Sequence, residues 1–170
     1  MARMFLADGI DCDGDSSGMD VASVHFCRPC NCCRKIKNMI IGLGTDIVDV
    51  DRIARMIADH GDHFLARVFT KAEIAHCQPR REPAPHYAGR WAAKEAVMKV
   101  LGTGFTNEVG WTDIEVLVRP SGQPYIELHG TTLDVAARLG IEEILVSISH
   151  TKNYATASAI GMATKTNNPK

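Results

Sequence analysis

The hydrophobic pattern of the chain is strongest between Pro83 and Leu101, where it predicts one long helix. Prolines stand in its first turn, good helix formers fill its middle, and glycines at positions 102 and 104 end it. Apolar residues cover nearly every face, which is typical of a helix in the interior of a domain. Glu95 falls in the middle of one apolar face. Because a lone buried charge is very costly, this carboxylate needs a partner.

Three cations accompany Glu95 on this helix. Lys99 follows Glu95 by one turn, and Lys94 follows Arg90 by one turn. A half-buried carboxylate beside a group of cations suits a site for magnesium and a phosphorylated substrate. The alternative is an ordinary helical ion pair, which stabilises a helix by only roughly 0.2–0.5 kcal/mol. The pattern alone leaves both interpretations open.

Upstream of this helix, the pattern predicts one strand and three helical pieces. Residues 40–48 alternate and are rich in β-branched side chains, which favours a strand. Residues 51–60 form an amphipathic helix that Gly61 interrupts, and residues 64–69 form a short second piece. A capping-box sequence at Thr70 opens a third piece, which ends at Cys77.

Downstream of the central helix, the pattern changes to strands. Residues 113–118 and 124–128 flank a Pro-Ser-Gly turn and predict a hairpin, and residues 144–149 and 154–160 predict another. A short amphipathic helix is expected between them, over residues 131–139. Helices first and hairpins later indicate an α+β domain with a mostly antiparallel sheet packed on the long central helix.

The first strand contains two glycines and an aspartate. Gly42 and Gly44 resemble part of a nucleotide-binding loop, but a lone G-x-G is weak, and close packing inside a buried strand is the preferred interpretation. Asp46 interrupts the apolar run near the end of the strand. It is either a cap or turn residue, or a metal ligand if the fold brings it near Glu95.

Two further positions have both a structural and a functional interpretation. Arg52 and Arg55 lie on the polar side of the helix over residues 51–60, as a solvated face or as a docking surface for an acidic partner. His150 stands at the rim of the last hairpin. It is either a hydrogen-bonded turn residue or a functional group.

The first 38 residues differ from the rest of the chain. They show no helical or strand period, and they hold five of the six cysteines, four of them in CRPCNCC. A zinc or redox site is one interpretation, although four ligands so close together can hardly surround one ion. A dispensable extension is the preferred one. The predicted organisation is an extension over 1–38, a domain over 39–162 and a tail over 163–170.

Composition excludes several classes of function. The chain has 170 residues, a net charge of −1 and 45% hydrophobic residues, so nothing in it favours binding to nucleic acid or a membrane. No apolar run approaches the roughly 20 residues of a membrane span. With one cysteine outside the extension, a reducing cytoplasm is the expected location. The surplus of basic residues between Arg80 and Lys99 points to a small polyanion.

Three segments in order carry a family resemblance: GLGTDIVDVDRI, RWAAKEAVMKVLGTG and SISHTKNYA. They closely resemble the holo-acyl-carrier-protein synthases, the short single-domain branch of the phosphopantetheinyl transferases, from Met39 to about Ile160. The resemblance implies the α+β fold of that family. It also implies transfer of the 4′-phosphopantetheine arm of coenzyme A to apo-acyl carrier protein, with magnesium, in support of fatty acid biosynthesis.

The resemblance also implies roles for individual residues. Asp46 and Glu95 match the two magnesium-binding carboxylates, and Glu95 and Lys94 match the K-E pair at the catalytic centre. Three basic residues align with residues that hold the coenzyme A phosphates: Arg90, Lys99 and His150. Arg52 aligns with an arginine that meets the acidic carrier protein.

The resemblance further implies homotrimers with sites at subunit interfaces. Three alternatives stay open: a magnesium-dependent enzyme acting on another nucleotide, an inactive module that binds coenzyme A, and a zinc-binding regulatory protein built on CRPCNCC. The base that accepts the serine proton also stays open, between Glu95 and a metal-bound water.

Overall fold

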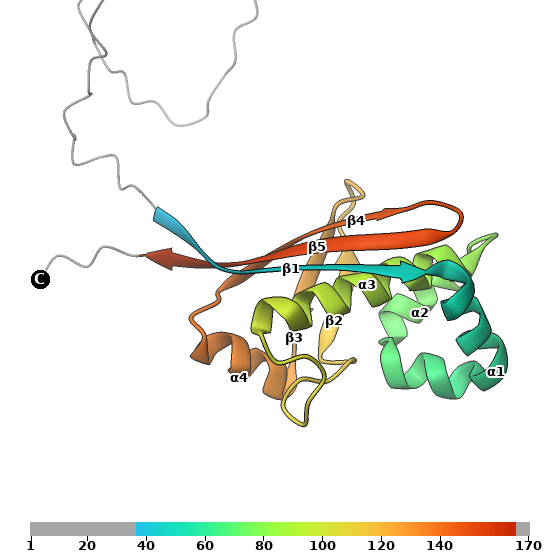
Figure 1. The fold of residues 1–170 in the computed structure, drawn as a ribbon, viewed down its shortest axis with the longest axis horizontal. Coiled ribbons are helices and arrows are strands. Elements are labelled where there is room, and N and C mark those ends of the chain that lie inside the picture. Colours follow the sequence, from blue (N-terminus) through green and yellow to red (C-terminus); the bar gives the residue numbers. More distant parts are fainter. Residues whose placement is uncertain (1–36, 166–170) are drawn as a thin grey trace, which may run out of the picture. The chain divides into compact units, whose positions relative to one another are not determined.

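The computed structural model of the protein describes residues 37–165 (Figure 1). The CRPCNCC sequence, with its predicted alternatives, lies outside these residues. The elements follow one another as β1 (Lys37–Asp49), α1 (Val50–Val68), α2 (Lys71–Cys77), α3 (Pro83–Leu101), β2 (Ile114–Val118), β3 (Pro124–Leu128), α4 (Gly130–Arg138), β4 (Glu143–His150) and β5 (Tyr154–Lys165).

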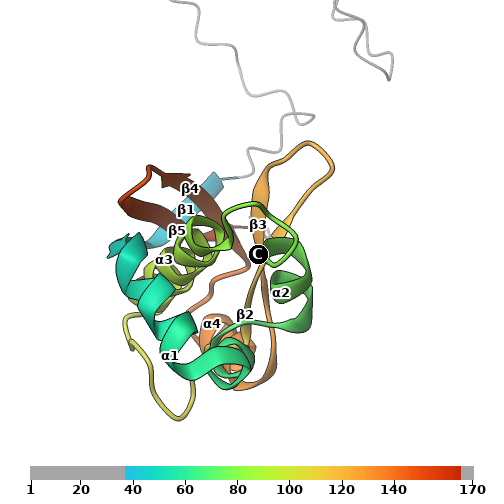
Figure 2. The same ribbon diagram turned by 90° about the vertical axis from the view of Figure 1, so that its right-hand side faces the viewer.

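The strands form two antiparallel sheets. The larger has the order β1-β5-β4, and the smaller is the hairpin β2–β3. The helix α3 lies along one face of the larger sheet and contacts all three of its strands (Figures 1 and 2). The predicted α+β fold, with antiparallel strands packed on a long central helix, is confirmed.

Two glycines allow α3 to approach β1 closely. A Cβ atom on Gly42 would lie 2.7 Å from the carbonyl oxygen of Val100, and one on Gly44 would overlap the carbonyl of Ala96. Since real side chains do not approach backbone so closely, these positions admit only glycine at this helix–sheet distance. The close-packing interpretation of the G-x-G sequence is confirmed.

Three of the predicted helices are found with small differences in their ends. Gly61 interrupts α1 as predicted: its backbone is non-helical, with φ 54° and ψ −138°, and two helical segments meet there at a kink. Asp49 caps α1 by accepting from the backbone N–H groups of Asp51 and Arg52. Within residues 37–165, no helix combines the length and hydropathy needed to cross a bilayer.

The first and last strands of the larger sheet in chain order, β1 and β5, are longer than predicted. β1 begins at Lys37 rather than at residue 40, and β5 continues to Lys165 rather than ending at residue 160, so β5 enters the predicted tail over 163–170. These two ends pair with each other, Lys37 opposite Lys165. Each strand therefore supplies backbone partners for the other, a long-range effect that a local pattern cannot reveal. The predicted boundaries at residues 39 and 162 fall inside paired strands.

Candidate active site

One group of predicted site residues gathers where α3 meets β1. The Nζ atom of Lys99 donates to Asp46 Oδ1 at 2.9 Å and to the carbonyl oxygen of Thr45 at 2.6 Å. Asp46 is mostly buried, with 17% of its side chain exposed, whereas Lys99 is half exposed. β1 therefore presents a carboxylate to α3, and the Lys99 ammonium lies against it.

Glu95 belongs to the same group. Burial raises the pKa of the Glu95 carboxyl, and the negative charge of Asp46 raises it further, while Lys99 and Arg52 oppose the increase. Such charge effects require close neighbours. The structure thus brings together four predicted site residues from β1, α1 and α3, which we name the carboxylate cluster: Asp46, Arg52, Glu95 and Lys99.

A second group, made only of basic side chains, lies where α3 meets β4. The rings of His86 and His150 meet edge to face, with their centroids 5.5 Å apart. Arg90 is 6% exposed, and its Nη1 donates to the carbonyl oxygen of His86 at 3.4 Å. Nearby, Arg80 Nη2 lies 3.3 Å from His76 Nε2. We name these five residues the basic cluster.

The two clusters lie on opposite flanks of α3. Helix geometry separates Arg90 from Glu95 by about 140° around the axis, and His86 from Glu95 by about 180°. The strand order agrees, because Asp46 lies on the edge strand β1 and His150 on the opposite edge strand β4, with β5 between them. In one chain, the body of the helix therefore separates the carboxylate cluster from the basic cluster.

Lys94 is not placed with the other cations. Its side chain is completely buried, and its Nζ donates to Glu73 Oε2 at 2.7 Å and to the carbonyl oxygens of Val68 and Trp111 at 2.9 and 2.8 Å. The prediction that Lys94 belongs to a cation group beside Glu95 is thus wrong, because Lys94 is buried in the core and pairs with Glu73. One residue along a helix turns the direction of the side chain by about 100°, so Lys94 and Glu95 point to different surroundings.

Sequence reasoning missed His76 and His86, and it included Arg80 only in the basic surplus between Arg80 and Lys99. These histidines come from different elements, and their grouping with His150 arises only when α2, α3 and β4 meet. The available signal was the four-residue spacing of His86 from Arg90, which puts these two residues on one face of the predicted helix.

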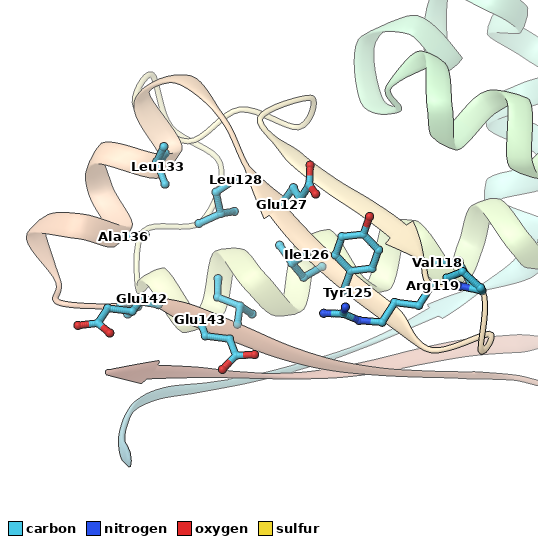
Figure 3. Close-up of a pocket in the computed structure, with 13 residues that line it drawn as sticks. Val118, Arg119, Tyr125, Ile126, Glu127, Leu128, Leu133, Ala136, Glu142 and Glu143 are labelled. Carbon is cyan, nitrogen blue, oxygen red and sulfur yellow. The ribbon is translucent and has the colours of Figure 1, made fainter. Parts of the chain in front are cut away.

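A groove of about 600 Å³ lies elsewhere, between the β2–β3 hairpin, α4 and the start of β4 (Figure 3). On its rim, the guanidinium of Arg119 lies 4.9 Å from the centre of the Tyr125 ring. None of the predicted site residues lines this groove. Its charged lining is one arginine, Arg119, against the three carboxylates of Glu127, Glu142 and Glu143, a balance that does not favour a phosphorylated substrate.

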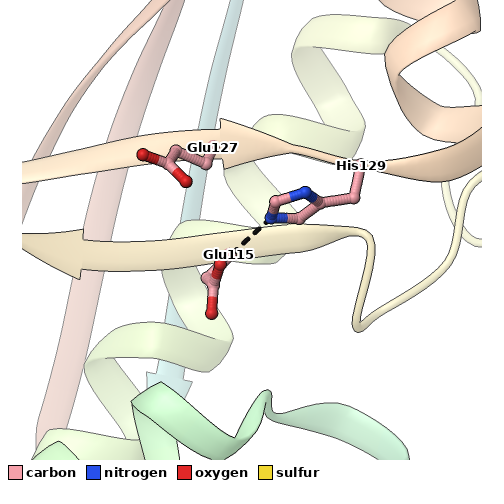
Figure 4. A group of neighbouring side chains, drawn as sticks. All are labelled: Glu115, Glu127 and His129. Atoms are coloured by element: carbon pink, nitrogen blue, oxygen red, sulfur yellow. Dashed lines mark hydrogen bonds and ion pairs between the residues drawn. The ribbon is translucent and has the colours of Figure 1, made fainter.

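The hairpin also carries a small group of metal-ligand types that no sequence spacing revealed. Glu115 and Glu127 are directly opposite in the register of β2 and β3, and His129 Nε2 lies 3.0 Å from Glu115 Oε2 (Figure 4). The Thr70 hydroxyl, together with His129, holds the pKa of Glu115 below its usual value. Like charges directly opposite destabilise a sheet, and the imidazole relieves this repulsion when protonated. This group is distinct from the predicted magnesium ligands Asp46 and Glu95.

Comparisons with known proteins show which family the chain belongs to. A family model described as the 4′-phosphopantetheinyl transferase superfamily matches residues 42–159, which include both clusters. A holo-[acyl-carrier-protein] synthase from Koribacter versatilis is 48% identical over 122 residues, which cover 72% of this chain and 98% of the relative. One from Chlamydia pneumoniae is 48% identical over 124 residues, covering 73% and 98% respectively.

Solved structures show the same likeness. The holo-[acyl-carrier-protein] synthase of Neisseria meningitidis has a TM-score of 0.68 and 30% identity, covering 72% of this chain and 98% of its own. That of Helicobacter pylori, solved in complex with coenzyme A, has a TM-score of 0.63 and 29% identity, covering 70% and 98%. The chain therefore belongs to the 4′-phosphopantetheinyl transferase superfamily.

Proposed function

We propose that the protein transfers the 4′-phosphopantetheine arm of coenzyme A to a serine hydroxyl of apo-acyl carrier protein and releases adenosine 3′,5′-bisphosphate. The observation that carries this proposal is the presence, on the two flanks of α3, of a carboxylate cluster and a basic cluster. Phosphoryl transfer needs cations on the phosphate oxygens and an oriented nucleophile. The coenzyme A complex of the Helicobacter pylori relative supports the same donor, and the relatives' names support the same acceptor. The reaction would support fatty acid biosynthesis.

Asp46 and Glu95 fit a magnesium ion. The charge of Asp46 raises the pKa of Glu95, so the two carboxyls act on each other electrostatically. When both are ionised they repel each other, and a cation between them would relieve this repulsion. Magnesium takes hard oxygen ligands and needs only one or two protein carboxylates beside phosphates and water. When bound, it would neutralise charge on the phosphate oxygens during transfer.

The remaining residues have roles that follow from their positions. Lys99 lies against Asp46 and is half exposed, so its ammonium can turn to a diphosphate oxygen. Arg90 and His150 hold phosphate groups of coenzyme A from the other flank of α3. Burial and the charge of Asp46 raise the pKa of the Glu95 carboxyl, so we assign Glu95 the serine proton.

The separation of the clusters favours sites shared between copies of the chain. A coenzyme A molecule cannot contact both flanks of a buried helix at once, so the carboxylate cluster of one copy would face the basic cluster of the next. The outer face of the larger sheet offers a contact surface, since Leu43, Ile160 and Leu145 lie side by side in its register and Leu43 is 69% exposed. A closed ring of three, the homotrimer implied by the family resemblance, would contain three complete sites.

Arg52 links the site to the carrier protein. It lies on the exposed side of α1 and also acts on Glu95 electrostatically. An acidic carrier docked on Arg52 would therefore present its serine to the carboxylate cluster. We place this exchange in the cytoplasm, where carrier protein and coenzyme A would both be available.

The test is the intact mass of an apo-acyl carrier protein after incubation with the full chain, coenzyme A and magnesium. A gain of one phosphopantetheine is expected, with loss of at least about 100-fold in rate for Glu95→Gln and on adding a chelator. Glu108→Gln, an exposed glutamate paired with Arg138, is the matched control and should keep full activity. Arg52→Glu should raise KM for the carrier and leave KM for coenzyme A unchanged.

The outcome separates the alternatives. No mass gain with several carrier proteins, from folded enzyme, would reject the transferase and favour an enzyme acting on another nucleotide. Binding of coenzyme A without any gain would favour an inactive binding module.

A further inference from the structure

His86 is not among the residues that the family resemblance or the sequence pattern assigns to the site. It lies on α3 one turn before Arg90, half-buried, and its ring packs edge to face on His150 at a centroid distance of 5.5 Å. His150 itself is exposed to solvent. An anion held by His150 would therefore lie beside the imidazole of His86.

The charges around His86 are all of one sign. Its neighbours are His150 from β4, Arg80 from the segment after α2, and Arg90 from α3, and His86 in turn acts on His76 from α2. Burial, and then these cations, lower the pKa of the His86 imidazole below its usual value. Within the described residues, no carboxylate is among the groups that shift the pKa of the His86 imidazole.

The buried arginine adds an independent observation. Arg90 is 94% buried, yet its Nε atom has no hydrogen-bond partner within the residues that the structure describes. A buried donor without a partner is costly, and several cations without a counter-charge are too. An anion bound at the cluster would supply the missing counter-charge.

We propose that His86 is a further phosphate-binding residue for coenzyme A, and that the His86–His150 pair takes up one proton from solvent when the phosphate binds. The inference rests on the proposed function, in which Arg90 and His150 hold coenzyme A phosphates. In the free protein, the surrounding cations disfavour a charged His86. A phosphate dianion reverses that balance, so the proton is bound together with the ligand, and binding is tighter at lower pH.

The test is isothermal titration of the full chain with adenosine 3′,5′-bisphosphate and with coenzyme A. It is run at pH 6, 7 and 8 in two buffers of different ionisation enthalpy, which gives the number of protons taken up. Wild-type protein should take up a proton and bind several-fold more tightly at pH 6 than at pH 8. His86→Phe keeps an aromatic ring against His150 but cannot be protonated. It should lose about tenfold in affinity at pH 6 and most of the proton uptake.

Two controls keep the result decisive. His86→Gln introduces a neutral hydrogen-bond donor. This variant should bind both ligands more tightly than His86→Phe does at pH 8, yet residue 86 should contribute no proton uptake. His60→Phe, on the exposed side of α1, should behave as wild type. If His86→Phe, folded by its thermal transition, keeps wild-type affinity and uptake, the inference is overturned while the proposed function stands. If the wild type binds neither ligand, both are overturned.

Discussion

Lys94 and Glu95 are neighbours in sequence, but their side chains serve different parts of the molecule. Glu95 faces the carboxylate cluster, whereas Lys94 points into the core and pairs with Glu73. Glu73 also accepts from the backbone N–H groups of Thr70 and Val116. One buried carboxylate thus joins the cap of α2 to β2 and α3, and Lys94 is a positioning residue for the helix that carries the site.

The ion pair predicts a specific pattern of stability. Lys94→Met leaves the buried Glu73 charge without its cation and should lower the free energy of unfolding by about 3–5 kcal/mol. Glu73→Gln in the Lys94→Met background removes that charge, so the double variant should be more stable than Lys94→Met alone. Urea unfolding of the two single variants and the double variant measures this coupling.

Activity measured on the same variants tests the catalytic role implied for Lys94 by the family resemblance. If Lys94 only positions α3, kcat per folded molecule in the double variant should fall by less than tenfold. A loss as large as that of Glu95→Gln, from fully folded protein, would instead support direct participation in catalysis.

At the scale of elements, the contact of β1 with α3 sets the geometry of the carboxylate cluster. Asp46 and Lys99 meet only because Gly44 lets the two backbones approach. Any side chain at residue 44 must push β1 and α3 apart. The contact between Asp46 and Lys99 would be disturbed first, because it lies next to this position.

Gly44→Ala is therefore expected to cost about 3 kcal/mol or more in stability, at the upper end for overpacking. Gly140→Ala is the matched control. Gly140 has a positive φ of 74° but open space around its Cβ position, so this substitution should lower the free energy of unfolding by only about 1 kcal/mol. Thermal unfolding compares the two. Equal losses would show that backbone conformation, and not close packing, explains the glycine at position 44.

The local sequence pattern predicts the helices and strands well, but it predicts the contacts between them poorly. The buried character of α3, the capping box at Thr70 and both hairpins follow from short-range periodicity and are found. The pairing of β1 with β5 and the cluster around His86 join residues distant in the chain, which no local period encodes. Only the family resemblance predicts that Asp46 lies near Glu95. The sequence pattern does not reveal that Lys94 points into the core, because the partner that makes its burial possible, Glu73, lies on another helix.

At the scale of the whole molecule, the two clusters predict complementation between inactive variants. Glu95→Gln damages the carboxylate cluster and His150→Ala the basic cluster, so each homo-oligomer should be inactive. If sites form between copies, subunits mixed one to one in a closed ring should regain about a quarter of wild-type activity. The mixture is made by co-expression, and its mass is checked by light scattering. Mixed oligomers without activity would place the whole site within one chain.

The pairing of β1 with β5 also has a consequence for synthesis. β1 is the first strand of the described chain and β5 the last, and the central position of the larger sheet belongs to β5. As the chain leaves the ribosome, β1 and β4 have no shared partner until residues 154–165 have emerged. The helix α3 can form early, but its sheet-facing side stays uncovered until then. A chain that stops before residue 154 should thus be a target for chaperones and proteases, although it already contains Asp46, Glu95 and His150.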